Sequence, residues 1–97
     1  MIRTMADIEI ERRHNLSLED ARGVVEQIAE SLKQKVGGTY YWEDDTLVFS
    51  RSGTSGAIVV TPEAVFIAIN TGPMMRPFRR QIATAIEQFL DEYVGSA

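Results

Sequence analysis

Residues 39–70 read TYYWEDDTLVFSRSGTSGAIVVTPEAVFIAIN, and this stretch decides the fold. Its first part, Thr39–Trp42, is aromatic and β-prone, and Thr46–Arg51 alternates apolar and polar side chains. The acidic residues Glu43–Asp45 lie between these two runs and are typical of a tight turn. The pattern therefore predicts a β-hairpin.

The second part of the stretch predicts another pair of strands. Ser52–Gly56 is rich in glycine and serine, and we expect it to form a turn. Ala57–Thr61 and Val65–Asn70 then read as apolar strands on either side of Pro62–Ala64. Because the connections are all short, the four strands are expected to form an antiparallel meander.

Upstream of this stretch, the pattern predicts one strand and one helix. In Asp7–Arg13, isoleucines alternate with acidic side chains, as in a half-buried strand. Ser17 is a candidate helix N-cap and Gly37 a candidate C-cap. Between the two caps, apolar side chains recur at three- and four-residue steps, at Ala21, Val25, Ile28, Leu32 and Val36.

Downstream of the stretch, Thr71–Pro73 breaks the sheet and a second amphipathic helix follows. Pro77 suits the first turn of this helix, where its missing N–H needs no partner, and Gly95 is expected to end it. The wide apolar face of the helix consists of Met75, Phe78, Ile82, Ala85, Ile86, Phe89, Leu90 and Tyr93.

The element order β-α-β-β-β-β-α predicts an α+β fold. We expect an antiparallel five-stranded sheet with two helices packed on one face, because that arrangement hides both apolar helix faces together. The 97 residues suit one domain, residues 1–97, with an ordered core from about residue 7 to 94.

The composition excludes several classes of protein. The net charge of −4 argues against a nucleic-acid binder, because such proteins usually carry a basic balance. The absence of cysteine excludes disulfides, thiolate metal sites and cysteine nucleophiles. No apolar run is long enough for a signal-peptide core or a transmembrane span. We therefore expect a cytoplasmic protein without a metal or cofactor.

No group of residues predicts catalysis. His14 is the single histidine, and we interpret it as a strand-end residue that hydrogen-bonds the start of the first helix. A pair of His14 with a serine stays open as the alternative, although Ser55 lacks the strand–elbow–helix context of a nucleophile. Ser52–Gly56 lacks the lysine and the following helix of a phosphate-binding loop, and Glu43–Asp45 lacks the spaced oxygens of a calcium loop.

A basic cluster, Arg76, Arg79 and Arg80, lies at the start of the second predicted helix, where cations oppose the helix dipole. Three interpretations stay open. The cluster is a solvated face with surface ion pairs, a docking site for an acidic partner or a second copy of the chain, or an anion site. Guanidinium groups form forked hydrogen bonds to carboxylates and phosphoryl groups, which suits the last interpretation.

Aromatic and methionine side chains predict either core packing or an apolar binding surface. Met75 and Phe78 lie near the start of the last helix, and Tyr40, Tyr41 and Trp42 are consecutive in a predicted strand. Because neighbouring strand residues point to opposite faces, at least one of the three aromatic rings is expected on the outer face. That exposure keeps a contact surface or a homodimer interface open.

The order and spacing of several motifs resemble the polyhydroxyalkanoic acid system protein family. The resemblance runs from about Asp7 to Tyr93 and rests on His14-x-Leu16, Asp20-Ala21-Arg22, Trp42-x-x-Asp45-x-Leu47-x-Phe49, Gly56-x-Ile58 and the break at Gly72. One departure is Asp44, which stands where a glycine is usual in the hairpin turn. The family-motif residues are His14, Arg22, Trp42, Asp45 and Gly56.

The resemblance implies a small bacterial protein of the polyhydroxyalkanoate system, with no catalytic residues to carry over. It implies binding to the polyhydroxyalkanoate granule or to a granule protein in the cytoplasm. The expected fold is also similar to a shortened helix-grip domain, which suggests the alternative of a carrier for a hydroxyacyl or fatty-acyl ligand between the sheet and the last helix. The candidate ligand- or partner-binding residues are Arg76, Arg79, Arg80, Tyr40, Trp42, Met75 and Phe78.

Overall fold

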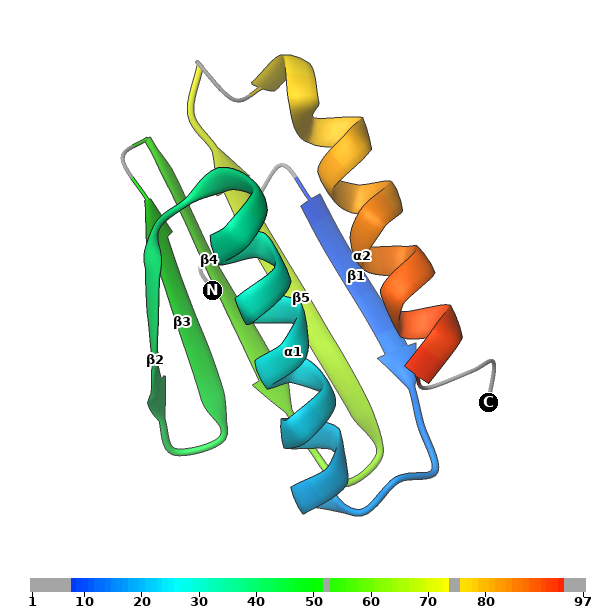
Figure 1. The fold of residues 1–97 in the computed structure, drawn as a ribbon. Helices are drawn as coiled ribbons and strands as arrows, with labels where there is room; N and C mark the ends of the chain where they lie inside the picture. The colour runs from blue at the N-terminus through cyan, green and yellow to red at the C-terminus, as the bar shows by residue number, and fades with distance from the viewer. Residues whose placement is uncertain (1–7, 52, 74–75, 94–97) are drawn as a thin grey trace, which may run out of the picture.

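Five antiparallel strands form one sheet, and two helices cover one of its faces (Figure 1). The computed structural model describes residues 8–51, 53–73 and 76–93. The elements follow the predicted order: β1 (Ile8–Arg13), α1 (Leu18–Val36), β2 (Thr39–Glu43), β3 (Thr46–Arg51), β4 (Thr54–Val60), β5 (Ala64–Thr71), a short 3-10 turn η1 (Arg76–Phe78) and α2 (Arg79–Tyr93).

The sheet has the strand order β1-β5-β4-β3-β2. β2 to β5 form the predicted meander, and β1 pairs with β5, where Ile8 lies opposite Ile69. α1 and α2 run in opposite directions over the same face, and no helix of the described residues lies over the other face (Figure 1). The predicted α+β fold class is therefore confirmed.

The ends of α1 follow directly from local sequence chemistry. The Ser17 hydroxyl accepts a hydrogen bond from the Asp20 N–H at 3.1 Å, which satisfies one free donor of the first turn. Gly37 has a φ of 80°, a conformation that glycine adopts without strain, and its N–H donates to the Lys33 carbonyl at 2.9 Å. Both predicted caps are confirmed.

The turn predicted at Ser52–Gly56 is shorter than expected, because β4 already begins at Thr54. Thr54 and Gly56 pair with β3 on one side and with β5 on the other, so two hydrogen-bonded ladders outweigh the local preference for a turn. A Cβ at Gly56 would lie 3.1 Å from the Ile69 Cγ1. Gly56 therefore serves close packing within the sheet.

The start of the last helix also differs from expectation. Pro77 lies in η1, and the α-helix itself begins at Arg79. Met75 and Gly95, which were predicted to belong to this helix and to its end, lie outside the described residues.

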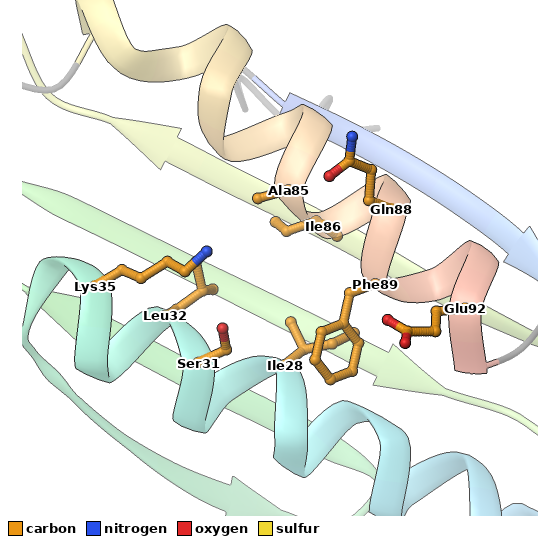
Figure 2. Close-up of a pocket in the computed structure, with 9 residues that line it drawn as sticks. All are labelled: Ile28, Ser31, Leu32, Lys35, Ala85, Ile86, Gln88, Phe89 and Glu92. Atoms are coloured by element: carbon orange, nitrogen blue, oxygen red, sulfur yellow. The ribbon is translucent and has the colours of Figure 1, made fainter.

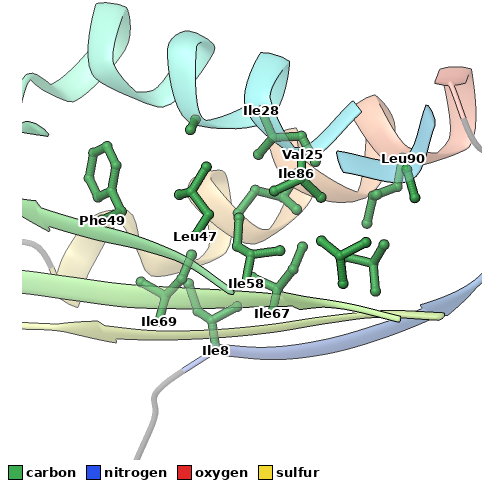
Figure 3. Packing of buried hydrophobic residues seen from close by; sticks show 14 of the residues in the cluster. Ile8, Val25, Ile28, Leu47, Phe49, Ile58, Ile67, Ile69, Ile86 and Leu90 are labelled. Atoms are coloured by element: carbon green, nitrogen blue, oxygen red, sulfur yellow. The ribbon is translucent and has the colours of Figure 1, made fainter. Parts of the chain in front are cut away.

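The core lies between the helix layer and the sheet (Figure 3). The strands contribute alternate residues to it, because successive strand side chains point to opposite faces. Leu47 and Phe49 on β3 are buried, for example, whereas Val48 between them is on the other face. The most deeply buried side chains are Ile28, Leu47, Ile67, Ile86, Leu90, Val25, Val60 and Val65.

Two glycines provide a matched test of this packing. Gly23 lies within α1, and a Cβ there would meet nothing within 4 Å. A Cβ at Gly72 would lie 2.2 Å from the Gly53 carbonyl oxygen.

In urea unfolding, we expect Gly23→Ala to raise the free energy of unfolding by about 0.5–1 kcal/mol, because alanine is the better helix former. We expect Gly72→Ala to lower it by about 1–3 kcal/mol, and equal stabilities would contradict this packing.

Candidate functional site

The uncovered face of the sheet carries a continuous apolar surface. We call it the sheet-face patch and define it as Tyr41, Val48, Ala57, Val59, Phe66 and Ala68. Strand pairing puts Tyr41 opposite Val48, Val48 opposite Ala57, and Ala57 opposite Ala68, and the next row puts Val59 opposite Phe66.

The three large side chains of the patch are exposed, at 57% for Tyr41, 39% for Val59 and 40% for Phe66. Acidic residues border them: Glu9 lies opposite Ala68 and Glu11 opposite Phe66. Apolar side chains gathered on neighbouring strands and rimmed by charges are typical of a contact surface.

The expected exposed aromatic residue is Tyr41, and its two neighbours face the other way. Tyr40 and Trp42 lie under α1, on the helix-covered side of the sheet. The Tyr40 hydroxyl donates to the Glu26 carboxylate at 2.7 Å, and Glu30 is a second acceptor for it. The Trp42 Nε1–H donates to the other oxygen of Glu26 at 2.6 Å. Two of the candidate ligand-binding residues thus attach β2 to α1.

These hydrogen bonds change the acidities of the partners. The Trp42 and Tyr40 hydrogen bonds hold the pKa of Glu26 below its usual value of 4.5, because they stabilise the carboxylate. The hydrogen bonds to Glu30 and Glu26 raise the pKa of Tyr40 above its usual 10.0, because two carboxylates oppose the phenolate. At neutral pH, Glu26 is therefore ionised and Tyr40 is a hydrogen-bond donor.

Three family-motif residues meet beside this network. The Arg22 guanidinium lies 4.3 Å from the centroid of the Trp42 ring, in a cation–π arrangement. The same guanidinium forms an ion pair with Asp45 at 3.4 Å. Arg22 of α1, Trp42 of β2 and Asp45 of the β2–β3 turn therefore hold one end of the helix on the hairpin. Asp44 beside them has a φ of 55°, which explains why a glycine suits that position.

His14 directly follows β1, and its ring forms a hydrogen bond within the connection that precedes α1. It is 4% exposed, its Nδ1 accepts from the Leu16 N–H at 3.1 Å, and its Nε2 lies 2.9 Å from the Thr61 carbonyl oxygen. Both ring nitrogens are therefore occupied when Nε2 carries the proton. The ring links the β1–α1 connection to the residue after β4.

The predicted arginine cluster belongs to a larger basic end of the molecule. The C-terminus of α1, the end of β3 and the start of α2 lie at one end of the sheet (Figure 1). We define the basic end as Lys33, Lys35, Arg51, Arg76, Arg79 and Arg80. Arg76, Arg79 and Arg80 line a hollow of about 630 Å³ beside β1, which Glu9 and Glu87 also line. Phe78, 49% exposed, lines a different hollow between the helices.

The structure therefore does not bring the candidate site residues together. Tyr40 and Trp42 lie at the β2 side of α1, the three arginines lie at the start of α2, and Met75 is outside the described residues. At the C-terminal end of α2, Asp91 forms an ion pair with Arg12 of β1 at 2.5 Å.

A groove runs between α1 and α2. One part has a volume of about 200 Å³ and is lined by Ile28, Leu32, Ala85 and Phe89, with Lys35 and Glu92 at its sides (Figure 2). A second part of about 500 Å³ shares Leu32, Lys35 and Ala85 with the first and extends to Arg51 and Phe78. The groove is therefore mainly apolar, with cations at the basic end.

The described part of the chain, residues 8–51, 53–73 and 76–93, holds neither a candidate metal site nor a candidate membrane-spanning helix. No three histidine, aspartate or glutamate side chains of these ranges are grouped closely enough to hold a metal ion. Neither of the helices in this part of the chain is both long enough and apolar enough to cross a membrane.

Comparison with known proteins identifies a family and a similar fold. Residues 8–94 match the family described as "Putative polyhydroxyalkanoic acid system protein". An NMR structure of PA4090 from Pseudomonas aeruginosa is similar, with a TM-score of 0.59 and 8% sequence identity, over 92% of this chain and 84% of that chain. No curated protein matches the sequence. At 8% identity, the structural likeness shows the fold alone.

The Glu26 network predicts a pH-dependent stability. The pKa of Glu26 is lower in the folded state than in the unfolded state, so ionised Glu26 stabilises the fold. This contribution is complete above the unfolded-state pKa and is lost as the pH falls through the folded-state pKa. We expect Glu26→Gln to lower the free energy of unfolding by about 1 kcal/mol at pH 7. The difference in the free energy of unfolding between Glu26→Gln and the wild type should shrink between pH 5 and about pH 3.

Urea unfolding at pH 7, 5, 4 and 3 measures this difference, and Glu11→Gln on the uncovered sheet face is the matched control. A Glu26→Gln difference that is the same at pH 7 and at pH 3 would contradict the role of the network.

Proposed function

Because the chain belongs to the polyhydroxyalkanoic acid system protein family, we propose that it is a non-enzymatic protein that attaches to the surface of polyhydroxyalkanoate granules. The family description names a system and no reaction. Attachment requires a contact surface and no catalytic group, and the chain offers such a surface on the uncovered side of its sheet.

The observation that carries the proposal is the sheet-face patch. Its three large side chains are exposed on one face of the sheet: Val59 and Phe66 pair across β4 and β5, and Tyr41 of β2 pairs with Val48 of β3. A polyester presents ester groups and alkyl chains, which an apolar surface contacts with a gain of hydrophobic free energy. Glu9 and Glu11 at the border stay in water when the patch is covered.

A granule-associated protein is the other partner that this surface would fit. A protein partner would cover the patch with apolar side chains of its own, and the acidic border would select basic groups around them. Attachment to the polymer and attachment to a protein differ in one observable respect, because only the first occurs on granules stripped of protein.

The basic end has a separate part in this proposal. Its cations lie at one end of the sheet, beside the helices, and are not part of the patch. Attraction between these cations and an anionic surface is screened by salt, whereas an apolar contact is not. Salt dependence therefore separates the two contributions.

A second candidate function is to carry a small acyl ligand between the sheet and the C-terminal helix. The groove between α1 and α2 favours it, because the groove is mainly apolar and has cations at one end. Such a carrier would gain thermal stability from a ligand by mass action.

Cosedimentation of the purified protein with polyhydroxyalkanoate granules, native and stripped, tests the attachment. We expect wild-type protein to pellet at low and at high salt. Threonine favours strands but has less apolar area than valine or phenylalanine, so replacement of Val59 and Phe66 by threonine should weaken binding by about tenfold or more.

The matched control replaces Arg79 and Arg80 by glutamate, which should affect binding only at low salt. Cosedimentation with phospholipid vesicles shows how much of the binding is unspecific attachment to any boundary between an apolar phase and water. Unchanged pelleting of the Val59→Thr, Phe66→Thr variant would overturn the assignment of the patch, and pelleting with native granules alone would identify a protein partner.

A further inference from the structure

The groove between the helices has one cationic end and one acidic end. Lys35 and Arg51 line the part beside Phe78, whereas Gln88 and Glu92 line the other part. Leu32, Ile82 and Ala85 form apolar walls near the cations. An amphipathic anion in this groove therefore has one favourable direction, with its charge at Lys35 and Arg51 and its chain toward Phe89.

A buried polar atom lies beneath the cationic end. The Thr54 side chain is 8% exposed, and its hydroxyl has no hydrogen-bond partner within the described part of the chain. An unpaired hydroxyl is unfavourable in an apolar environment. A ligand with a polar group at this position would supply the hydrogen bond that the Thr54 hydroxyl lacks.

Strand pairing locates this hydroxyl relative to the cation. Thr54 lies directly opposite Arg51, and both belong to the helix-covered face of the sheet. Thr54 also lines a small apolar cavity with Phe49 and Ile69, and this cavity shares the side chains of Leu32 and Ile82 with the groove. Arg51 and Thr54 therefore lie on the same side of the sheet as a ligand that enters the groove.

We propose that this groove binds a medium-chain hydroxyalkanoate, with its carboxylate at Lys35 and Arg51 and its hydroxyl group at Thr54. The inference rests on the second candidate function and names the ligand class and the head-group residues of that site. The alkyl chain follows the apolar side of α2 from Gln81 to Phe89, a rise of about 12 Å, which suits an extended chain of about ten carbons.

Isothermal titration of the full chain with three soluble ligands tests the proposal. The ligands are 3-hydroxydecanoate, decanoate and decanol, each below the concentration at which it aggregates. We expect the affinity to fall in that order, because decanoate lacks the hydroxyl group and decanol lacks the charge.

Two variants separate the contributions. Lys35→Gln with Arg51→Gln should weaken 3-hydroxydecanoate binding by about tenfold or more, because charge-assisted hydrogen bonds are lost. Lys33→Gln with Arg80→Gln makes the same change in net charge outside the groove and should leave binding unchanged. Thr54→Val should abolish the preference for 3-hydroxydecanoate over decanoate while it leaves decanoate binding intact.

The possible failures are distinguishable. If none of the three ligands binds, both the carrier function and this inference are wrong. If the ligands bind but the Lys35→Gln, Arg51→Gln variant equals its control, the carrier function stands and the head-group assignment is overturned. If Thr54→Val retains the preference for the hydroxylated acid, the assignment of Thr54 is overturned.

Discussion

Burial of both helices on the same side of one sheet is the constraint on which the other features depend. Two amphipathic helices hide their apolar faces together, and alternate side chains of the strands complete that core. Within the part of the chain that the structure describes, no helix covers the opposite side of the sheet, where Tyr41, Val59 and Phe66 are exposed. The same packing separates the helices by a groove, so one constraint produces both candidate binding surfaces.

The family-motif residues stabilise this arrangement in ways that are visible in the structure. Arg22, Trp42 and Asp45 attach the first helix to the hairpin, and His14 links the β1–α1 connection to Thr61, the residue after β4. Gly56 lets β4 approach the Ile69 side chain. These residues form the scaffold, and the exposed patch and the groove are made of other residues.

The sequence predicts α1, the meander and the element order well, because caps, apolar periodicity and short connections are local properties. The sheet-face patch was harder to predict. Val59 and Phe66 lie in continuous apolar runs that are typical of strands buried on both faces, and only the position of the helices reveals which face is open. The cationic end of the groove joins Lys35 to Arg51 by tertiary packing, which neither periodicity nor spacing reports.

Carbene footprinting of the protein, alone and bound to polyhydroxyalkanoate granules, tests the central claim most directly, because the label reports solvent access at individual side chains. The account predicts that Tyr41, Val59 and Phe66 lose labelling on the granule, while Phe78 between the helices remains accessible. Protection of Phe78 with undiminished labelling of the sheet-face patch would contradict the claim that the uncovered sheet face is the contact surface.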